Sequence, residues 1–255
     1  MGLLKAVSSP SHASGLSRLQ SAVRSTLKSA RKREALWVRF LDLARLLKTA
    51  ERRSLLWTRL VHADAVHQTT PYTCEDRYPE LFDLAARLRP DAERIWSFGC
   101  STGAELVALR QRFRHAEIVG SEINPRSRRL ASKRLASDAL AAVVKPDEVG
   151  GTFDIIFAMA VLQREPHKVV EMEVEDLSGH YSFERFDTAV HTLVERLRTG
   201  GLLCVANAHY RVEDSAAARA LEPVAGSPAM EEPLFGPHGR RLRDAVARTM
   251  FRKVA

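Results

Sequence analysis

The sequence predicts an α/β fold, a doubly wound and mostly parallel sheet with helices on both faces. An apolar run of strand length at 95–98 breaks into a glycine turn at 99–103, and apolar residues at helical spacing follow. A second apolar run, at 116–121, leads directly into the acidic residue Glu122. Further apolar runs at 152–163 and 202–206 follow helical segments, which predicts a sheet of about seven strands joined by crossover helices.

A basic arm is predicted ahead of this sheet. Residues 1–62 carry 13 Lys and Arg against 3 acidic residues, a net charge of +10, whereas the rest of the chain carries 26 against 28, a net of −2. Residues 1–33 are rich in Ser, Arg and Lys, so we expect a disordered tail, with an organelle transit peptide as the alternative. Residues 34–66 predict an amphipathic helix. Its arginines are either solvated on a packed helix or attach the chain to an anionic membrane surface or a protein partner.

Residues 67–255 are predicted to form one ligand-binding domain. The domain begins with a polar segment at 67–73 and a helix that ends before Pro90. Thr73 and Asp76 have the spacing of a capping box at the start of this helix. Because the segment precedes the first strand, its polar side chains are candidates either for a lid over a bound ligand or for an ordinary surface loop: His67, Gln68, Thr70 and Arg77.

The glycine turn at 99–103 is compatible with two interpretations, a dinucleotide-binding turn and a hydrolase nucleophile elbow. A dinucleotide fingerprint needs glycines at 99, 101 and 104, but Ser101 and Ala104 occupy the last two positions, which argues against a pyrophosphate. Residues 99–103 also match the G-x-S-x-G nucleophile elbow, which would make Ser101 the nucleophile of a hydrolase. The chain ahead of the turn reads as helical and has no HGGG-type oxyanion segment, so the hydrolase is a minor alternative.

The spacing of Glu122 favours a third kind of ligand. Glu122 lies 19 residues beyond Gly103, where an acidic residue is placed to hold the two hydroxyl groups of a ribose. Without the pyrophosphate glycines, this pattern fits an adenosyl ligand that lacks phosphates. The run 97–105 resembles motif I of class I S-adenosylmethionine-dependent methyltransferases, in the version found in the chemotaxis-receptor glutamate methyltransferases. The resemblance extends over residues 70–206.

The resemblance implies a Rossmann-like fold and S-adenosyl-L-methionine as the cofactor. It implies that Glu105 orients the amino-acid end of the cofactor, that Arg77 pairs with its carboxylate, and that Glu122 holds the ribose. Ser97 stands where many relatives keep a carboxylate, which is a departure from the family pattern. The implied cofactor contacts are Phe98, Gly99, Cys100, Ser101, Thr102, Gly103, Glu105, Glu122, Ile123, Asp147, Met159, Ala160 and Arg77.

Later elements follow in order. Asn124 and Pro125 predict the start of a helix over 126–137, and residues 140–144 predict a third strand. Residues 152–163 resemble motif IV and its strand. Nucleic-acid methyltransferases that modify amino groups carry Asp/Asn-Pro-Pro-aromatic at this strand end, and receptor methyltransferases carry Arg-Asn. Residues 158–161 are Ala-Met-Ala-Val, so the resemblance extends to neither substrate chemistry.

The acceptor side is harder to place. His167, in an insertion at 163–181, is a candidate general base. A helix is expected from Ser182 to the glycine pair at 200–201, followed by a strand at 202–206. His209 and Tyr210, beyond that strand, are the second candidates for contact with the acceptor. Residues 249–254 predict a closing antiparallel strand, and the sequence does not place a sixth strand within 211–234.

Composition sets the remaining expectations. The three cysteines are scattered, which supports neither a disulfide framework nor a metal site and favours a reducing, cytoplasmic location, with organelle targeting left open by the tail. Because the positive charge belongs to the arm and not to the domain, a nucleic-acid substrate is disfavoured. The predicted function is methyl transfer to a small-molecule acceptor by in-line displacement. Protein carboxyl methylation, RNA methylation and a non-catalytic S-adenosylmethionine-binding module are the alternatives.

Overall fold

The computed structural model describes residues 49–62, 66–68, 76–230 and 233–254. The chain divides into two compact units, Met1–Arg53 and Ser54–Ala255, and nearly all described residues belong to the second. The expected tail at 1–33 and the expected helix at 34–48 lie outside the described residues, so the domain boundaries inferred from the sequence stay a prediction. Helix α2 (Ala50–Val61) is the described part of the predicted arm. Within the described ranges, no helix is long and apolar enough to cross a membrane.

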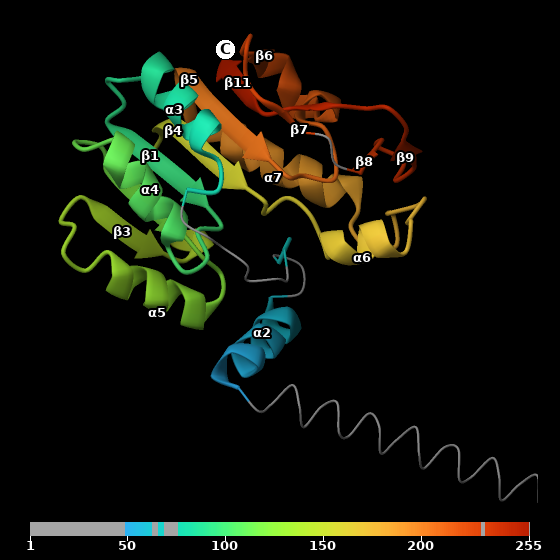
Figure 1. Cartoon of the computed structure of the whole chain (residues 1–255), viewed down its shortest axis with the longest axis horizontal. Coiled ribbons are helices and arrows are strands. Elements are labelled where there is room, and N and C mark those ends of the chain that lie inside the picture. The colour runs from blue at the N-terminus through green and yellow to red at the C-terminus, as the bar shows by residue number, and fades with distance from the viewer. Residues whose placement is uncertain (1–48, 63–65, 69–75, 231–232, 255) are drawn as a thin grey trace, which may run out of the picture. The chain divides into compact units, whose positions relative to one another are not determined.

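Seven strands form one sheet in the order β3-β2-β1-β4-β5-β11-β6 (Figure 1). Strands β1 to β5 pair in parallel, and β11 runs antiparallel to both β5 and β6. From β1 the chain adds β2 and β3 on one side of the sheet, and then returns to add β4 and β5 on the other side. This change in strand order between β1 and β4 places a ligand crevice at the carboxyl ends of these strands. The prediction of a doubly wound, mostly parallel sheet is confirmed. The strands are β1 Arg94–Phe98, β2 Glu117–Ser121, β3 Ala141–Val144, β4 Phe153–Met159, β5 Leu197–Ala206, β6 Leu221–Pro223 and β11 Met250–Lys253.

Helices cover both faces of the sheet (Figure 1). Helices α3 (Pro79–Leu88), α4 (Ala104–Arg112) and α5 (Pro125–Arg134) contribute to one apolar core, and α7 (Phe183–Glu195) contributes to the other. Successive strand residues point to opposite faces, so Ile95 packs in the first core and Trp96 in the second. Every residue of β4 is buried, as expected for a central strand covered on both faces.

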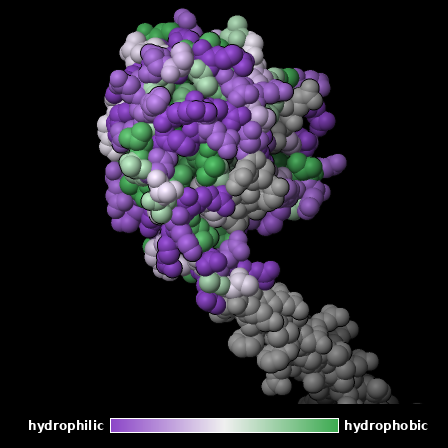
Figure 2. Space-filling view, turned by 60° about the vertical axis from the view of Figure 1, so that its left-hand side comes forward, coloured by the Kyte–Doolittle hydropathy of each residue, from purple (hydrophilic) through white to green (hydrophobic). Residues whose placement is uncertain are grey.

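Short elements surround the sheet. The 3-10 turns are η1 Pro146–Glu148, η2 Val212–Asp214 and η3 Ala216–Ala220, and α6 spans Pro166–Glu171. Two small hairpins pair β7 (Ala229–Met230) with β10 (Ala247–Arg248), and β8 (Leu234–Phe235) with β9 (Arg241–Leu242). The surface seen in Figure 2 is mainly hydrophilic, with hydrophobic residues exposed in small separate groups.

The structure corrects several predicted boundaries. The glycine pair at 200–201 does not end helix α7, which stops at Glu195. The two glycines lie inside β5, where the register with β4 shifts. Gly200 has φ of 78°, and a Cβ on Gly201 would lie 2.8 Å from two backbone oxygens, so this irregularity requires glycine. Strand β6 occupies 221–223 at the sheet edge. Helix α3 begins at Pro79, and Thr73 of the expected capping box lies outside the described residues.

Candidate cofactor-binding site

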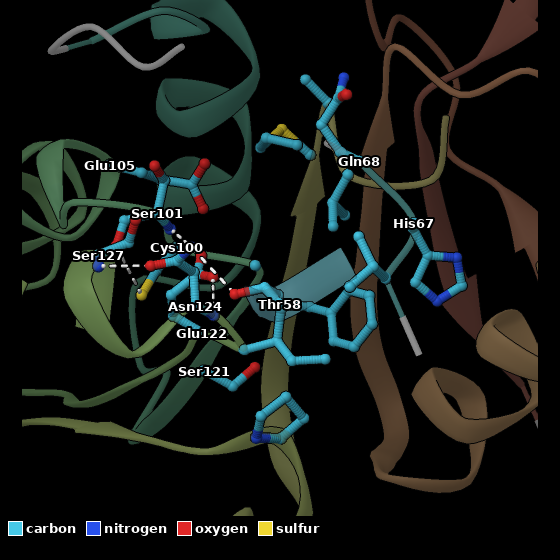
Figure 3. Close-up of a pocket in the computed structure, with 18 of the residues that line it drawn as sticks. Thr58, His67, Gln68, Cys100, Ser101, Glu105, Ser121, Glu122, Asn124 and Ser127 are labelled. Carbon is cyan, nitrogen blue, oxygen red and sulfur yellow. Dashed lines mark hydrogen bonds between the residues drawn. The ribbon is translucent and has the colours of Figure 1, made fainter. Parts of the chain in front are cut away.

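A cavity opens at the carboxyl ends of β1, β2 and β4, and encloses about 1120 Å³ including its mouth. One side is polar: Glu105, Ser101, Glu122 and Asn124 lie together there, whereas His67 lies on the opposite side (Figure 3). This position is the one that the reversal of strand order predicts for a ligand in a doubly wound sheet. The cavity is therefore the candidate site.

The glycine turn, residues 99–103, forms the floor between the two sides. Gly99 has φ of 79°, and a Cβ there would lie 2.6 Å from Val161 Cγ2, so the turn approaches the end of β4 too closely for any other residue. Gly103 has φ of 83°, and a Cβ there would lie 3.0 Å from the Ala131 backbone in α5. The N–H groups of Gly99 and Cys100 both donate to Ser121 O, at 2.9 and 3.0 Å. These contacts fix the turn against the end of β2.

Glu122 is turned toward this glycine turn. Its Oε2 accepts the Ser101 N–H at 2.8 Å, and its Oε1 accepts the Asn124 N–H at 2.7 Å. The residue is only 9% exposed, and burial raises the pKa of the carboxyl above its ordinary value, although the two backbone donors act against that shift. Each carboxylate oxygen keeps a second lone pair, so both can accept a further hydrogen bond from ligand hydroxyl groups.

Glu105 and Arg77 supply opposite charges elsewhere in the cavity. Glu105 Oε1 accepts a hydrogen bond from Ser97 Oγ at 2.8 Å. Ser97 thus holds a carboxyl group that comes from the following helix, which accounts for the missing carboxylate at position 97. Burial raises the pKa of Glu105 to about 7, against the opposing effects of the Ser97 hydrogen bond and the Arg77 guanidinium. Together, the Glu105 carboxyl and the Arg77 guanidinium offer one charge partner each to the ammonium and the carboxylate of an amino-acid group.

Ser101 Oγ distinguishes two of the alternatives at the turn. This oxygen is buried and has no hydrogen-bond partner within the part of the chain that the structure describes. A nucleophile elbow requires a histidine bonded to the serine oxygen. The geometry therefore does not support the hydrolase alternative. An unsatisfied buried hydroxyl at the wall of a cavity is instead suited to bonding a ligand.

Helix α2 covers the Glu122 side of the cavity. Asn124 Nδ2 donates to Thr58 Oγ1 at 3.1 Å, and Ser54 Oγ donates to Asn124 Oδ1 at 2.8 Å. The same Asn124 Oδ1 accepts the N–H groups of Arg126 and Ser127, which confirms the predicted cap of the following helix. The two side chains from α2 therefore reach the residue that adjoins Glu122.

The segment expected to form a lid also reaches the cavity. Val66, His67 and Gln68 line it, and Thr70 lies outside the described residues. His67 Nδ1 lies 2.6 Å from Tyr181 Oη. Tyr78 lines the cavity as well and donates its hydroxyl to Asn207 Oδ1 at 2.8 Å, at the end of β5.

Most of the residues implied as cofactor contacts meet in this cavity. Three do not line it. Thr102 and Gly103 lead into α4, and Asp147 is exposed in η1, where its neighbour Pro146 lines the cavity instead. Those that do line it are Arg77, Phe98, Gly99, Cys100, Ser101, Glu105, Glu122, Ile123, Met159 and Ala160.

The three candidates for acceptor chemistry lie elsewhere. His167 is exposed on α6. His209 is buried, and its Nε2 lies 3.0 Å from Arg164 O. Tyr210 donates its hydroxyl to Tyr181 O at 2.6 Å, and burial raises its pKa to about 12. His209 and Tyr210 bond to backbone carbonyls inside the protein, and none of the three residues lines the cavity, so their roles toward an acceptor stay predictions that the cavity itself does not support.

Sequence reasoning missed several cavity residues. Leu55, Thr58 and Arg59 come from α2, which was predicted only as an amphipathic arm, and Tyr181 supports the cavity from the insertion. Asn124 was predicted only as a helix cap. Its position next to Glu122 was the available signal for a second role.

No protein-family model matches the chain, and no curated protein matches its sequence. Solved structures with a similar fold include several methyltransferases. CalS10 with bound S-adenosylmethionine, an amino pentose methyltransferase from Micromonospora echinaspora, is 24% identical with a TM-score of 0.40, over 52% of this chain and 50% of CalS10. NodS from Bradyrhizobium japonicum WM9, an N-methyltransferase in complex with S-adenosyl-L-homocysteine, is 17% identical with a TM-score of 0.44, over 82% of this chain and 90% of NodS.

The sugar N-methyltransferase KedS8 from Streptoalloteichus sp ATCC 53650 is 21% identical with a TM-score of 0.36, over 49% of this chain and 44% of KedS8. The strand order and strand directions of this chain are by themselves those of a Rossmann-like fold. The chain matches no more than half the length of CalS10 and of KedS8. At these identities the likeness extends to the fold and not to the acceptor.

Proposed function

We propose that the chain is an S-adenosylmethionine-dependent methyltransferase that acts on a small-molecule acceptor. The observation that carries the proposal is the placement of Glu122. Its buried carboxylate ends β2, adjoins the glycine turn through the Ser101 N–H, and keeps lone pairs for two ligand hydroxyl groups. A ribose without phosphates satisfies this arrangement, since the turn lacks the glycines that a pyrophosphate requires.

The other cavity residues fit the rest of the same ligand. The methionine portion of S-adenosylmethionine carries an ammonium and a carboxylate, and Glu105 and Arg77 offer a charge partner for each. The unsatisfied Ser101 Oγ offers a further hydrogen bond to a polar ligand atom. Ile123 and Pro146 give the Glu122 side an apolar surface suited to an adenine ring.

The cofactor supplies an electrophilic methyl group on a sulfonium, so transfer by in-line displacement requires little activation by the protein. The residues of the chain bind, orient and exclude water. Glu122 and Glu105 hold two separate parts of the ligand, which fixes the direction of the sulfonium between them. Helix α2 covers the Glu122 side through Thr58 and Asn124. This division of roles makes positioning, rather than acid–base catalysis, the main contribution of the protein.

Calorimetric titration of the full chain with S-adenosylmethionine tests this proposal. We expect Glu122→Gln to weaken binding about 30-fold, because glutamine keeps one acceptor oxygen and loses one hydrogen bond to a charged acceptor, which contributes about 2 kcal/mol. Glu117→Gln is the matched control, since Glu117 lies at the other end of β2, where it pairs with Arg94 outside the cavity.

The control variant should bind within twofold of the wild type. Absence of binding heat from the folded wild-type protein would overturn the proposal. Binding without turnover of any acceptor, in small-molecule, protein and RNA fractions alike, would identify a non-catalytic binding module instead. An attachment of the arm to an anionic membrane or a protein remains a separate prediction, tested by the salt dependence of binding to anionic vesicles with and without residues 1–48.

A further inference from the structure

The side of the cavity opposite Glu122 has a chemistry of its own. We define the acceptor wall as His67, which lies across from the carboxylates in Figure 3, together with Arg59, which lines the cavity from helix α2. The acidic residues that line the cavity, within the described ranges, are Glu105 and Glu122, and both belong to the proposed cofactor side. The acceptor wall therefore presents a cationic and a hydrogen-bonding group to the cavity, and the carboxylate that pairs with Arg59, Glu165 Oε1 at 4.0 Å from Nη2, belongs to a residue that does not line the cavity.

Tyr181 fixes the orientation of His67. The Tyr181 side chain is 1% exposed, and its hydroxyl has His67 Nδ1 as its hydrogen-bond partner, at 2.6 Å. If that hydroxyl accepted from Nδ1–H, its own proton would be left buried without an acceptor, which is costly. We therefore assign the Tyr181 hydroxyl as the donor and Nδ1 as the acceptor. In the neutral ring the proton then resides on Nε2.

Tyr181 is itself held from behind. Tyr210 donates its hydroxyl to Tyr181 O at 2.6 Å, and the Tyr181 ring packs against the rings of Tyr210 and His209. The residues beyond β5 thus reach the cavity indirectly, through Tyr181 and then His67. Within the described residues, Nε2 of His67 has no protein partner, so its N–H is available to a ligand.

Positive charge surrounds this imidazole. Arg164 donates from Nη1 to Val66 O at 2.9 Å, directly behind the segment that carries His67. Burial lowers the pKa of His67 to about 4, and the Arg185 and Arg164 guanidinium groups contribute to that shift. At neutral pH His67 is therefore uncharged. It acts as a fixed donor and is a poor proton acceptor, and a cationic group would be repelled by the neighbouring arginines.

We propose that the acceptor wall takes an acceptor that carries an oxyanion, either a carboxylate or an ionised phenol, with His67 Nε2–H and the Arg59 guanidinium as its donors. This inference rests on the proposed function. An oxyanion needs no general base, which agrees with a wall whose imidazole donates from Nε2 and whose neighbouring carboxylate, Glu165, lies outside the cavity lining. In the transfer, an oxygen lone pair forms the new O–C bond and the C–S electron pair stays on sulfur, so one negative and one positive charge are neutralised and no proton is released.

The chemistry of the labelled product tests the class of acceptor. The full chain is incubated with methyl-labelled S-adenosylmethionine and a small-molecule cell extract. Label that alkali releases as methanol identifies a carboxyl ester, and alkali-stable label in a product whose unmethylated form shows the ultraviolet shift of a phenol in alkali identifies a phenol ether. Either outcome supports the proposal. Alkali-stable label in any other product, label in the amine fraction, or label in no fraction overturns it, whereas failure to bind S-adenosylmethionine in calorimetry overturns the proposed function instead.

Two variants test the role of His67. His67→Phe keeps a ring without a donor, and His67→Gln keeps an N–H group of similar reach. We expect His67→Phe to raise KM for the labelled acceptor about tenfold, while the Kd for S-adenosylmethionine stays within twofold and His67→Gln restores most of the loss. Equal effects of the two variants would overturn the role.

Nitrogen-15 NMR of the wild-type histidines gives a readout that needs no activity. We expect an unprotonated Nδ1 and a protonated Nε2 on His67 between pH 6 and pH 8, which are on the neutral side of its pKa of about 4. The opposite tautomer would overturn the assignment of the donor.

Discussion

The amino ends and the carboxyl ends of the parallel strands, here called the amino edge and the carboxyl edge of the sheet, are built in contrasting ways. At the amino edge, Asp154 near the start of β4 accepts the N–H groups of Glu93 and Arg94, both at 2.9 Å, and hydrogen bonds from Arg198 at 2.9 and 3.0 Å. Although burial alone would raise the pKa of Asp154, these donors outweigh it and lower that pKa. The charge at this edge is satisfied by the protein itself.

The carboxyl edge leaves its polar groups less satisfied. Burial raises the pKa values of Glu105 and Glu122, and Ser101 Oγ has no partner among the described residues. The backbone differs as well. Both edges use glycine for left-handed conformations, at Gly151 and Gly200 on the amino edge and at Gly99 and Gly103 on the carboxyl edge. The carboxyl edge also holds three other residues in this region, with φ of 50° at Ser101, 55° at Ala160 and 53° at Asn207.

The difference indicates a division of labour within one sheet. Groups that are satisfied in the free protein contribute to folding, and groups that are left strained or unsatisfied are available to a ligand. The amino edge should therefore govern stability, and the carboxyl edge should govern binding. Three substitutions test this division.

Asp154→Ala should have the largest effect. It removes the carboxylate that accepts two backbone N–H groups and pairs with the guanidinium groups of Arg89 and Arg198, so we expect the free energy of unfolding to fall by about 3 kcal/mol. Denaturant titration measures this loss. Calorimetry on the folded fraction should give an unchanged Kd for S-adenosylmethionine. A weakened Kd with normal stability would invert the comparison between the edges.

The titration of Glu105 should have an intermediate effect. The ammonium group of the ligand binds the ionised form of the Glu105 carboxyl. Because the pKa of Glu105 is about 7, the ionised fraction of this carboxyl rises about tenfold between pH 6 and pH 8. The affinity for S-adenosylmethionine should rise about tenfold over the same interval, and binding should release a proton near pH 7. Calorimetry in buffers of different ionisation enthalpy measures both quantities.

The effect of Glu105 on stability has the opposite sign. Its folded-state pKa exceeds the ordinary value of 4.5, so this carboxyl stabilises the ligand-free protein most below pH 4.5, and the contribution is lost as the pH rises through about 7. Glu105→Gln should remove that loss, stabilising the ligand-free protein at pH 8, and should flatten the pH dependence of affinity. An unchanged pH dependence in this variant would assign the titration to another group.

Ala160→Gly should have the smallest effect. Glycine relieves the left-handed conformation at φ of 55° but adds chain entropy to the unfolded state, so we expect a net gain of about 0.5–1 kcal/mol in the free energy of unfolding. Ala158→Gly, two residues earlier inside β4, is the control and should destabilise the protein. Urea titrations compare the two. Equal destabilisation by both would show that the carboxyl edge stores no strain at Ala160.

Most strands of the sheet could be predicted from the sequence, because each of them carries a strong local signal. Apolar runs bounded by turns predicted the ends of β1 and β2 to within one residue and those of β4 to within four. Strand β6 had no such signal, since it has three residues, ends in Pro223, and buries only Leu221. The glycine pair at 200–201 looked like a helix end because glycine serves helix termini and strand irregularities equally well.

The two sides of the site also differ in how well the sequence predicts them. The cofactor side was predictable because Gly99, Glu105 and Glu122 lie within a short stretch with characteristic spacing. The acceptor wall was not, since His67 and Tyr181 are 114 residues apart and meet only through the fold. His67 was expected to belong to a lid, but no local pattern pointed to its partner. Contacts across such separations leave no periodicity in one sequence.

Asn124 joins helix α2, the start of α5 and Glu122 through hydrogen bonds of a single side chain and its own N–H. Docking of α2 and occupancy of the Glu122 side therefore share one residue, and thermodynamic reciprocity applies to them. If docking of α2 raises the affinity for a ligand by some factor, the bound ligand shifts the docking equilibrium of α2 by the same factor toward the docked state. Protease cleavage near residue 62 would slow by that factor when the site is saturated.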